Sequence, residues 1–327
     1  MRHIWAGFLL CALAQPASAQ DVRMRLETAF DGWRAAHDTT GALGTGMYAE
    51  DGHWVAQNTG KANAPQVGEL ASVSKSVTAV CTLALVEDGR LDWSDRLPAL
   101  LGQAPDVTVA ELVTHTSGLG PDSTQVTMPI WLDRAPDPFA HFSDHVLTAV
   151  NARLSQQGTR GMYLYNNENY ALLGLVIEAV SARPYWETCQ TALDLGIDIL
   201  PSPRSGAFQP WGGLQAHPHS YITFLEAHFG KDSIIGSDPF GLPHIDLGGG
   251  AYYGMGMIFR PFRESFNFWH FGALCLPGRL NVGSFAALWE GEVAALAIYD
   301  ACVDWPAMGA LDTALVQAIY PLSLIHI

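Results

Sequence analysis

The sequence predicts a mixed α/β (α+β) protein whose sheet is built from both ends of the chain, with an all-helical domain inserted between them. Three observations lead to this prediction. Near the N-terminus, a helical pattern of apolar residues is followed by two strand-like runs around a turn. The middle of the chain carries mostly helical patterns. The C-terminal part contains a series of strand-like runs and ends on a helical pattern.

The spacing of apolar residues predicts the individual elements in order. Apolar residues at helical spacing, or helix start and stop signals, predict helices at 22–37, 72–87, 108–112, 140–153, 169–180, 220–228 and 305–319. Runs rich in apolar, β-branched and aromatic residues predict strands at 41–48, 53–57, 252–259, 268–276, 282–290 and 293–303. Proline and glycine predict loops at 129–138 and 206–213. This order assigns residues 20–75 and 205–321 to an α/β domain and residues 76–204 to a helical domain.

Composition narrows the classes of function. Hydrophobic residues make up 49% of the 327 residues and charged residues 15%, as in a globular protein. The formal net charge of −15 argues against binding to nucleic acid or to anionic membranes. We therefore expect a small molecule as the partner, with no nucleic acid and no membrane association after export.

Both ends of the chain carry processing signals. Arg2 and His3 precede an apolar run that is too short to span a bilayer, and the small residues Ala17-Ser18-Ala19 follow it. We interpret residues 1–19 as a signal peptide cleaved after Ala19, which predicts a periplasmic or secreted protein. Residues 322–327 match the in-frame translation of a sequencing adapter, and we interpret them as a sequencing scar.

The cysteines leave two interpretations open. Four of them remain after the predicted cleavage, Cys81, Cys189, Cys275 and Cys302. Exported proteins can keep disulfides, so Cys275 and Cys302 pair if their strands end at the same edge, and otherwise they are free buried cysteines. No Cys and His cluster has metal-ligand spacing, so neither a metal nor a cofactor is expected.

Ser72 and Lys75 form the strongest chemical signal in the sequence. Lys75 is one of three lysines and the only charged residue between Leu70 and Val86. Burying an ammonium in such a stretch is costly unless it finds partners or loses its proton. On a helix, residues three apart share a face, so the Ser72 hydroxyl would lie beside an amine able to activate it. Ser-x-x-Lys alone occurs by chance in many proteins, so the interpretation depends on further motifs.

Further motifs occur in one order over nearly all of the mature chain. They are Ala71-Ser72-Val73-Ser74-Lys75, Leu112-Val113-Thr114-His115-Thr116-Ser117-Gly118-Leu119, Tyr165-Asn166-Asn167, Gly212-Gly213-Leu214, Tyr253-Gly254-Met255-Gly256-Met257 and His270-Phe271-Gly272. With these motifs the chain resembles the penicillin-recognising serine hydrolases, which include class C β-lactamases, D-alanyl-D-alanine carboxypeptidases and family VIII esterases. The resemblance implies a β-lactamase/transpeptidase-like fold with an antiparallel sheet flanked by helices.

The resemblance also implies roles for individual residues. Ser72 would be the nucleophile, and either Lys75 or Tyr165 would be the general base. The backbone N–H groups of Ser72 and Ala273 would form the oxyanion hole. The remaining site residues, expected to bind substrate, are Asn167, His270, Phe271 and Gly272.

One position departs from the family pattern. Phe271 stands where the family usually has a Thr or Ser hydroxyl that helps to bind a substrate carboxylate. Strand alternation would place His270 and Gly272 on one face and Phe271 on the other. We therefore expect an esterase or amidase acting through an acyl-enzyme. The alternatives are a β-lactamase or D-Ala-D-Ala carboxypeptidase, and a non-catalytic binding or sensor module on the same fold.

Overall fold

The computed structural model describes residues 19–48, 54–59, 67–134, 140–154, 158–195 and 198–320. Residues 1–18 of the predicted signal peptide and the predicted scar at 322–327 lie outside the described residues, as does the turn expected at 50–52. Among the described helices, none combines the length and the apolar character needed to cross a membrane.

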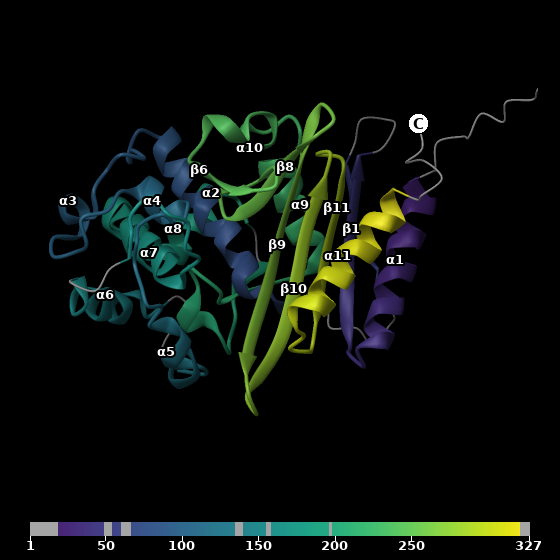
Figure 1. The fold of residues 1–327 in the computed structure, drawn as a ribbon, viewed down its shortest axis with the longest axis horizontal. Helices are drawn as coiled ribbons and strands as arrows, with labels where there is room; N and C mark the ends of the chain where they lie inside the picture. The colour runs from purple at the N-terminus through teal and green to yellow at the C-terminus, as the bar shows by residue number, and fades with distance from the viewer. Residues whose placement is uncertain are drawn as a thin grey trace, which may run out of the picture.

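An eight-stranded antiparallel sheet forms the centre of the molecule (Figure 1). Its strand order is β2-β1-β11-β10-β9-β8-β7-β6. The strands are β1 (Gly41–Tyr48), β2 (Trp54–Thr59), β6 (His244–Gly248), β7 (Ala251–Gly254), β8 (Met257–Phe262), β9 (Ser265–Leu276), β10 (Leu280–Trp289) and β11 (Val293–Tyr299). The first strand pairs with the last, with Gly41 opposite Tyr299. The predicted fold class is therefore confirmed, because both ends of the chain build the sheet.

Helices cover both faces of this sheet. The helices α1 (Ala19–Ala36) and α11 (Trp305–Ile319) lie on one face, where Leu26, Phe30, Leu311 and Leu315 bury a separate apolar cluster against the sheet. The helix α9 (Pro218–Phe229) packs on the other face of β1 and β11. Beyond α9 lies the helical part of the molecule (Figure 1).

The helical part contains α2 (Ser74–Glu87), α3 (Leu97–Leu101), α4 (Val109–Val113), α5 (Thr124–Trp131), α6 (Ser143–Asn151), α7 (Asn167–Ser181) and α8 (Tyr185–Ala192). A small sheet of β3 (Gly68–Glu69), β5 (Leu214–Ala216) and β4 (Ile199–Pro201) adjoins it. The remaining short helices are η1 (Ala71–Val73), η3 (Gly206–Phe208), α10 (Ile234–Ser237) and η4 (Pro239–Gly241). Strand β4 falls in the range that the sequence assigned to the helical domain, but it pairs with β5.

Several local predictions need correction. The helix expected from Ser72 begins at Ser74, because the tighter 3₁₀ turn η1 comes first. The single strand expected at 252–259 is two strands, β7 and β8, separated by a turn in which Gly256 has a φ of 77°. The loop expected around Pro129 is partly helical, since Pro129 lies inside α5. Short elements such as β3, β4 and β5 are absent from the prediction because two or three residues are too few to show a repeated alternation.

Two disulfides are present among the described residues. Cys81 of α2 is bonded to Cys189 of α8, with Cα atoms 5.3 Å apart. Cys275 of β9 is bonded to Cys302 after β11, with Cα atoms 5.5 Å apart. The second bond settles the pairing that the sequence left open, because β9 and the chain after β11 do end at the same edge.

Candidate active site

Ser72 lies on a sharp turn between β3 and α2. Ala71, just before it, has a φ of 46°, a left-handed conformation that costs a residue with a Cβ about 1–2 kcal/mol. The turn is held in place from β10, because Ser284 Oγ donates to the Leu70 carbonyl at 2.6 Å. Strand β9 lies against the turn at Gly272, where a Cβ would collide with the Leu70 carbonyl and with Ser284. The strained backbone at Ala71 thus positions Ser72 at the turn.

Lys75 is fully buried one turn further on, with no exposed surface. Its Nζ donates to Asn167 Oδ1 at 2.7 Å and to the Trp211 carbonyl at 2.7 Å, and lies 3.4 Å from Ser72 Oγ. All three partners are neutral, so they do not compensate an ammonium as a carboxylate would. Burial lowers the pKa of Lys75 to about 7, against the opposing effect of Asp122. Near neutral pH, a large fraction of Lys75 is therefore an uncharged amine beside Ser72.

Tyr165 closes the other side of Ser72. Its ring centroid lies 4.9 Å from Lys75 Nζ, and its hydroxyl is hydrogen-bonded to Ser72. The side chain is 38% exposed at the cleft, while the hydroxyl end points inward. Burial of that end raises the pKa of Tyr165 above its usual value, against the smaller effect of the hydrogen bond to Ser72. Tyr165 is therefore a neutral phenol, able to donate its proton.

His270 reaches the cleft from β9. Its ring lies 6.0 Å from the Tyr165 ring and 6.1 Å from the Tyr253 ring. Its Nδ1 is 2.6 Å from the Phe271 carbonyl, which can only accept, so Nδ1 carries the proton. Burial, helped by the charge of Lys75, lowers the pKa of His270 to about 3. The ring is thus neutral, and its Nε2 is a hydrogen-bond acceptor.

The side chain of Phe271 is not in the cleft. It stacks on Phe285 with ring centroids 4.5 Å apart and contacts Trp305 of α11. The prediction that Phe271 binds substrate is therefore wrong for its side chain. The cause is strand alternation, which places His270 and Gly272 toward η1 and Phe271 toward α11.

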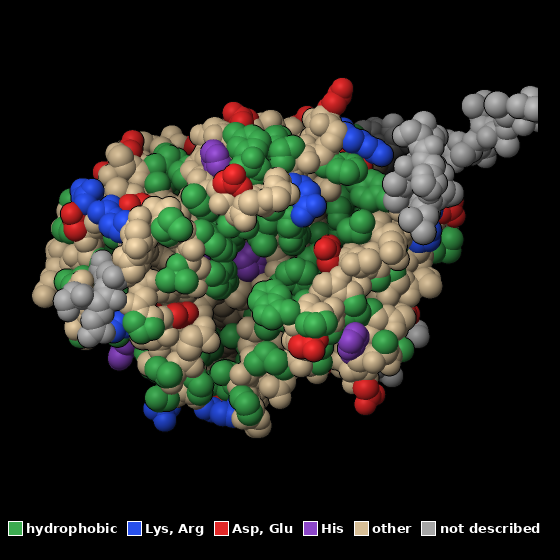
Figure 2. All heavy atoms as spheres, viewed as in Figure 1, with side chains coloured by type: hydrophobic (Ala, Val, Ile, Leu, Met, Phe, Trp, Pro, Cys, Tyr) green, Lys and Arg blue, Asp and Glu red, His purple; other side chains and the backbone are tan. Residues whose placement is uncertain are grey.

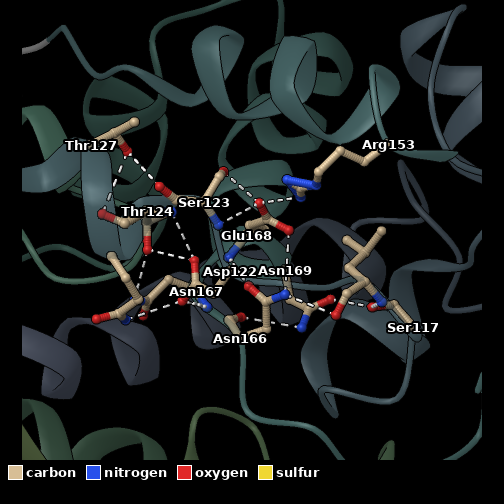
Figure 3. Close-up of polar contacts among 12 residues, drawn as sticks. Ser117, Asp122, Ser123, Thr124, Thr127, Arg153, Asn166, Asn167, Glu168 and Asn169 are labelled. Atoms are coloured by element: carbon tan, nitrogen blue, oxygen red, sulfur yellow. Dashed lines mark hydrogen bonds and ion pairs between the residues drawn. The ribbon is translucent and has the colours of Figure 1, made fainter. Parts of the chain in front are cut away.

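Asn167 sits in a dense polar network at the start of α7 (Figure 3). Its Nδ2 donates to Thr124 Oγ1 at 3.0 Å, and its backbone N–H donates to Asp122 Oδ2 at 3.2 Å. The neighbouring Glu168 is buried, and it pairs with Arg153 at 2.6 Å. It also accepts from the backbone N–H and the hydroxyl of Ser123 at 2.9 and 2.5 Å. These bonds fix the helix end that holds Asn167 against Lys75.

A buried histidine lies directly behind Tyr165. The ring of His115 packs against the rings of Tyr165, Tyr170 and Tyr253 at 4.5, 5.1 and 5.0 Å. Its Nδ1 lies 3.0 Å from Asn169 Nδ2, and its Nε2 lies 3.2 Å from the Tyr253 hydroxyl. Burial, with the charge of Lys75, lowers the pKa of His115 well below its usual value. His115 is thus a neutral support for Tyr165.

The predicted residues therefore meet at one place. Ser72, Lys75, Tyr165, Asn167 and His270 surround a common point, drawn from η1, α2, the start of α7 and β9. Ala273 follows Gly272 on β9 next to η1, and its oxyanion role stays a prediction. Figure 2 shows the molecule hollowed between the helical part and the sheet, with mainly hydrophobic side chains around the hollow.

Sequence reasoning missed four contributors to the site. His115 lies within the motif at 112–119, and Trp211 directly precedes the motif Gly212-Gly213-Leu214, so the sequence holds a signal for both. Asp122 and Thr124 carry no sequence signal, because their contact with Asn167 depends on how α5 and α7 meet. In the part of the chain that the structure describes, no group of three or more His, Cys, Asp and Glu side chains is arranged to hold a metal ion.

Comparison with known proteins agrees with this geometry. Residues 33–193 match the family model described as Beta-lactamase. The chain carries a β-lactamase-family domain. The resemblance read from the motifs is thereby confirmed for the domain that residues 33–193 match.

Curated relatives match this domain over part of their length. Penicillin-binding protein 4* of Bacillus subtilis is 33% identical over 139 residues, which is 39% of this chain and 28% of the relative. Protein flp of Staphylococcus aureus strain COL is 28% identical over 137 residues, 36% of this chain and 24% of the relative. The matched region spans about a quarter of the length of these relatives.

Solved structures match the β-lactamase-family fold over most of the chain. The D-amino acid amidase of Ochrobactrum anthropi SV3, complexed with L-phenylalanine, has a TM-score of 0.69 at 18% identity and covers 92% of this chain and 98% of its own. The octameric penicillin-binding protein homologue of Pyrococcus abyssi has a TM-score of 0.68 at 19% identity and covers 90% and 77%. At these identities, the likeness concerns the fold.

Proposed function

We propose that this protein is an exported serine hydrolase that cleaves neutral esters or amides through an acyl-enzyme on Ser72. One observation carries the proposal. A fully buried amine, Lys75 Nζ, lies 3.4 Å from Ser72 Oγ, and its hydrogen-bond partners among the described residues are neutral. A structural lysine would gain from a buried carboxylate partner, whereas an activating lysine has to lose its proton easily.

The reaction that fits these positions has two halves. Ser72 Oγ attacks the carbonyl carbon as its proton passes to the neutral amine of Lys75, and the new C–O bond leaves a tetrahedral oxyanion. The N–H groups of Ser72 and Ala273 would stabilise that oxyanion, a contribution of about 3 to 4 kcal/mol per donor. The alcohol or amine leaves with a proton, and water then attacks the acyl-enzyme, releasing the acid and restoring Ser72.

We assign the general base to Lys75 and the proton donor for the leaving group to Tyr165. A group whose pKa is about 7 is available in both protonation states at neutral pH, which suits a general base. Burial makes Tyr165 a weaker acid than a free phenol, so at neutral pH it is the donor of the pair. It takes the proton from Lys75 as it gives its own to the leaving group.

A neutral substrate fits the cleft better than a carboxylate. His270 is uncharged, presents an acceptor in Nε2, and sits where a substrate carboxylate would need a donor or a cation. Phe271 adds no hydroxyl, because it faces α11. Structural neighbours named as a D-amino acid amidase and a D-stereospecific amidohydrolase support amides beside esters.

A serine-directed probe tests the proposal. A fluorophosphonate should label the wild-type protein and leave Ser72→Ala unlabelled and inactive, with an unchanged melting temperature, because removing one hydroxyl needs no repacking. Ser94→Ala, a matched change at an exposed serine, should be labelled like the wild type. Activity retained in Ser72→Ala would exclude Ser72 as the nucleophile.

The substrate class follows from a rate comparison on the same samples. Hydrolysis of a short-chain nitrophenyl ester is expected to exceed turnover of a chromogenic cephalosporin. Fast cephalosporin turnover without ester hydrolysis would favour the β-lactamase or carboxypeptidase alternative. Labelling without turnover of either substrate would favour a sensor module.

Export is supported by two features. The N-terminal sequence has the charge, apolar run and small residues of a signal peptide. Two disulfides are joined in the structure, which is typical of oxidising compartments. N-terminal sequencing of the exported protein should find Gln20 first. A start at Met1 in the cytoplasmic fraction would contradict this.

A further inference from the structure

We propose that Asp122 and Thr124 are positioning residues for Lys75: together they set the orientation of the Asn167 amide, and Asp122 supplies the charge that tunes the lysine. The inference rests on the proposed function only in giving Lys75 the role of base. Its geometric part, a one-way series of hydrogen bonds from Lys75 to Asp122, stands on the contacts of the described residues.

The direction of the series follows from what each group can donate. Lys75 Nζ donates to Asn167 Oδ1 at 2.7 Å, and Asn167 Nδ2 donates to Thr124 Oγ1 at 3.0 Å. The single hydroxyl hydrogen of Thr124 then goes to Asp122 Oδ1 at 2.7 Å, since a carboxylate can only accept. Every bond runs toward Asp122. With the amide reversed, its NH₂ group would face the amine donor of Lys75 and its oxygen would face a hydroxyl already committed to Asp122.

Asp122 is itself held at the place where two helices start (Figure 3). Its Oδ1 accepts the backbone N–H of Thr124 at 2.9 Å, the first residue of α5. Its Oδ2 accepts the backbone N–H of Asn167 at 3.2 Å, the first residue of α7, and Gln125 Nε2 at 3.2 Å. Free N–H groups at helix starts stabilise a negative charge. The carboxylate is therefore fixed relative to both helices, and through α7 relative to Lys75.

Among the described residues, the other ionisable groups that pack around Lys75 add no negative charge. The rings of Tyr165 and Tyr170 lie 4.9 and 5.7 Å from Nζ, and burial raises the pKa of both phenols. Burial lowers the pKa of His115 and of His270, so both imidazoles are uncharged at neutral pH. Asp122 is the group whose charge opposes the effect of burial on Lys75.

Two substitutions separate the two contributions of this pair. In Asp122→Asn, the amide oxygen can still accept from Thr124, so the Thr124 hydroxyl keeps its orientation while the charge is lost. The amide NH₂ then stands in place of Oδ2, and the bond from the Asn167 N–H is lost with the charge. In Thr124→Val, the side chain at position 124 keeps its shape and Asp122 keeps its charge. Asn167 Nδ2 loses its acceptor, so the amide is free to turn. Thr124→Ser restores the hydroxyl.

The effect of the Asp122 charge on the Lys75 pKa is measured by NMR, without an activity assay. The chain has three lysines, Lys61, Lys75 and Lys231, so [¹³Cε]lysine labelling gives a simple NMR titration in which loss of one signal in Lys75→Met assigns Lys75. An opposite charge favours the charged form, so Asp122→Asn should lower the Lys75 pKa by roughly half a unit to one unit. Asp144→Asn, the same change at an exposed residue of α6, should leave it unchanged.

The effect of the Asn167 amide orientation is measured through the rate of acylation by the fluorophosphonate as a function of pH. The wild-type rate should fall as the pH drops through about 7, where Lys75 becomes protonated. In Asp122→Asn this acid limb should move to lower pH, in step with the NMR shift. Thr124→Val should lower the plateau rate by about tenfold to a hundredfold, because a base displaced from the nucleophile is inefficient. Thr124→Ser should return it close to the wild-type rate.

The outcomes separate this inference from the proposed function. An unshifted Lys75 pKa in Asp122→Asn, or a wild-type plateau in Thr124→Val, overturns the inference while labelling of the wild type upholds the hydrolase. A protein that no probe labels overturns the hydrolase, and the NMR shift then still decides whether Asp122 tunes Lys75. A melting temperature measured for each variant distinguishes a lost site from a lost fold.

Discussion

The two walls of the cleft are built in different ways. On the helical wall, Asn166, Asn167, Glu168 and Asn169 at the start of α7 are buried and bound by side chains and backbone from several neighbouring segments. On the sheet wall, β9 contributes one polar side chain, His270, bonded to a carbonyl of its own strand, and the bare backbone of Gly272.

This difference indicates a division of work. Groups that must stay within a fraction of an ångström of Ser72 are placed on the wall with many mutual hydrogen bonds, since networks of this kind fix side-chain positions. The sheet wall has fewer constraints, so its side chains can change without disturbing Ser72 and Lys75. We infer that the helical wall sets whether acylation occurs and that the sheet wall sets which substrates are accepted.

Breaking the helical wall should have the larger effect. Arg153→Met removes the cation that pairs with buried Glu168 at 2.6 Å and leaves the carboxylate uncompensated. We expect a loss of about 3 kcal/mol in the free energy of unfolding. Acylation should slow for every substrate in the same proportion, because a displacement of Glu168 also moves the neighbouring Asn167, which contacts Lys75. Urea unfolding and the acylation rate measure the two effects.

A double variant checks the cause. Arg153→Met combined with Glu168→Gln removes both charges and keeps an acceptor for Ser123, whose N–H and hydroxyl donate to Glu168. It should be more stable than Arg153→Met alone, because no unpaired charge is left buried. Equal stability of the single and double variants would mean that the pair does not act through its charge.

Sequence patterns alone predicted most of the large sheet and the helices α1 and α11 on one of its faces, but they did not predict β6. The pattern at 305–319 matches α11 residue for residue, because a long helix that buries one face repeats its apolar residues several times. They also predicted that the side chains of Ser72 and Lys75 lie beside each other, since a single charge in an apolar stretch is visible without a structure. The same reasoning failed at 252–259, where a turn at Gly256 against the Lys75 backbone divides one apolar run into β7 and β8.

The supporting residues could not be predicted, for a physical reason. Asp122 and Thr124 matter through contacts with Asn167, which lies far away along the chain, and such contacts leave no periodicity. An aspartate beside Ser and Thr usually indicates a turn. Even the disulfide from Cys81 to Cys189 follows from the packing of α2 on α8 and not from the spacing of the cysteines.

Changing the sheet wall should alter the ranking of substrates with a smaller effect on the chemistry. His270→Lys places a donor and a potential cation where the neutral imidazole now presents an acceptor. The kcat/KM ratio of 3-carboxyphenyl acetate to phenyl acetate should rise about tenfold, since a hydrogen bond to a charged group contributes roughly 1.5–3 kcal/mol. An unchanged ratio would show that β9 does not face the leaving group.

Phe271→Thr is the matched control on the same strand, and it should have the smallest effect of all. It restores the hydroxyl that the family usually has at this position, yet the side chain faces Phe285 and Trp305 on the far side of the sheet. The substrate ratio should therefore stay at its wild-type value while the melting temperature falls, because a stacked ring is lost. A raised ratio for the carboxylated ester would mean that β9 can rotate to bring residue 271 into the cleft. The sheet wall would then be adaptable in its backbone as well as in its side chains.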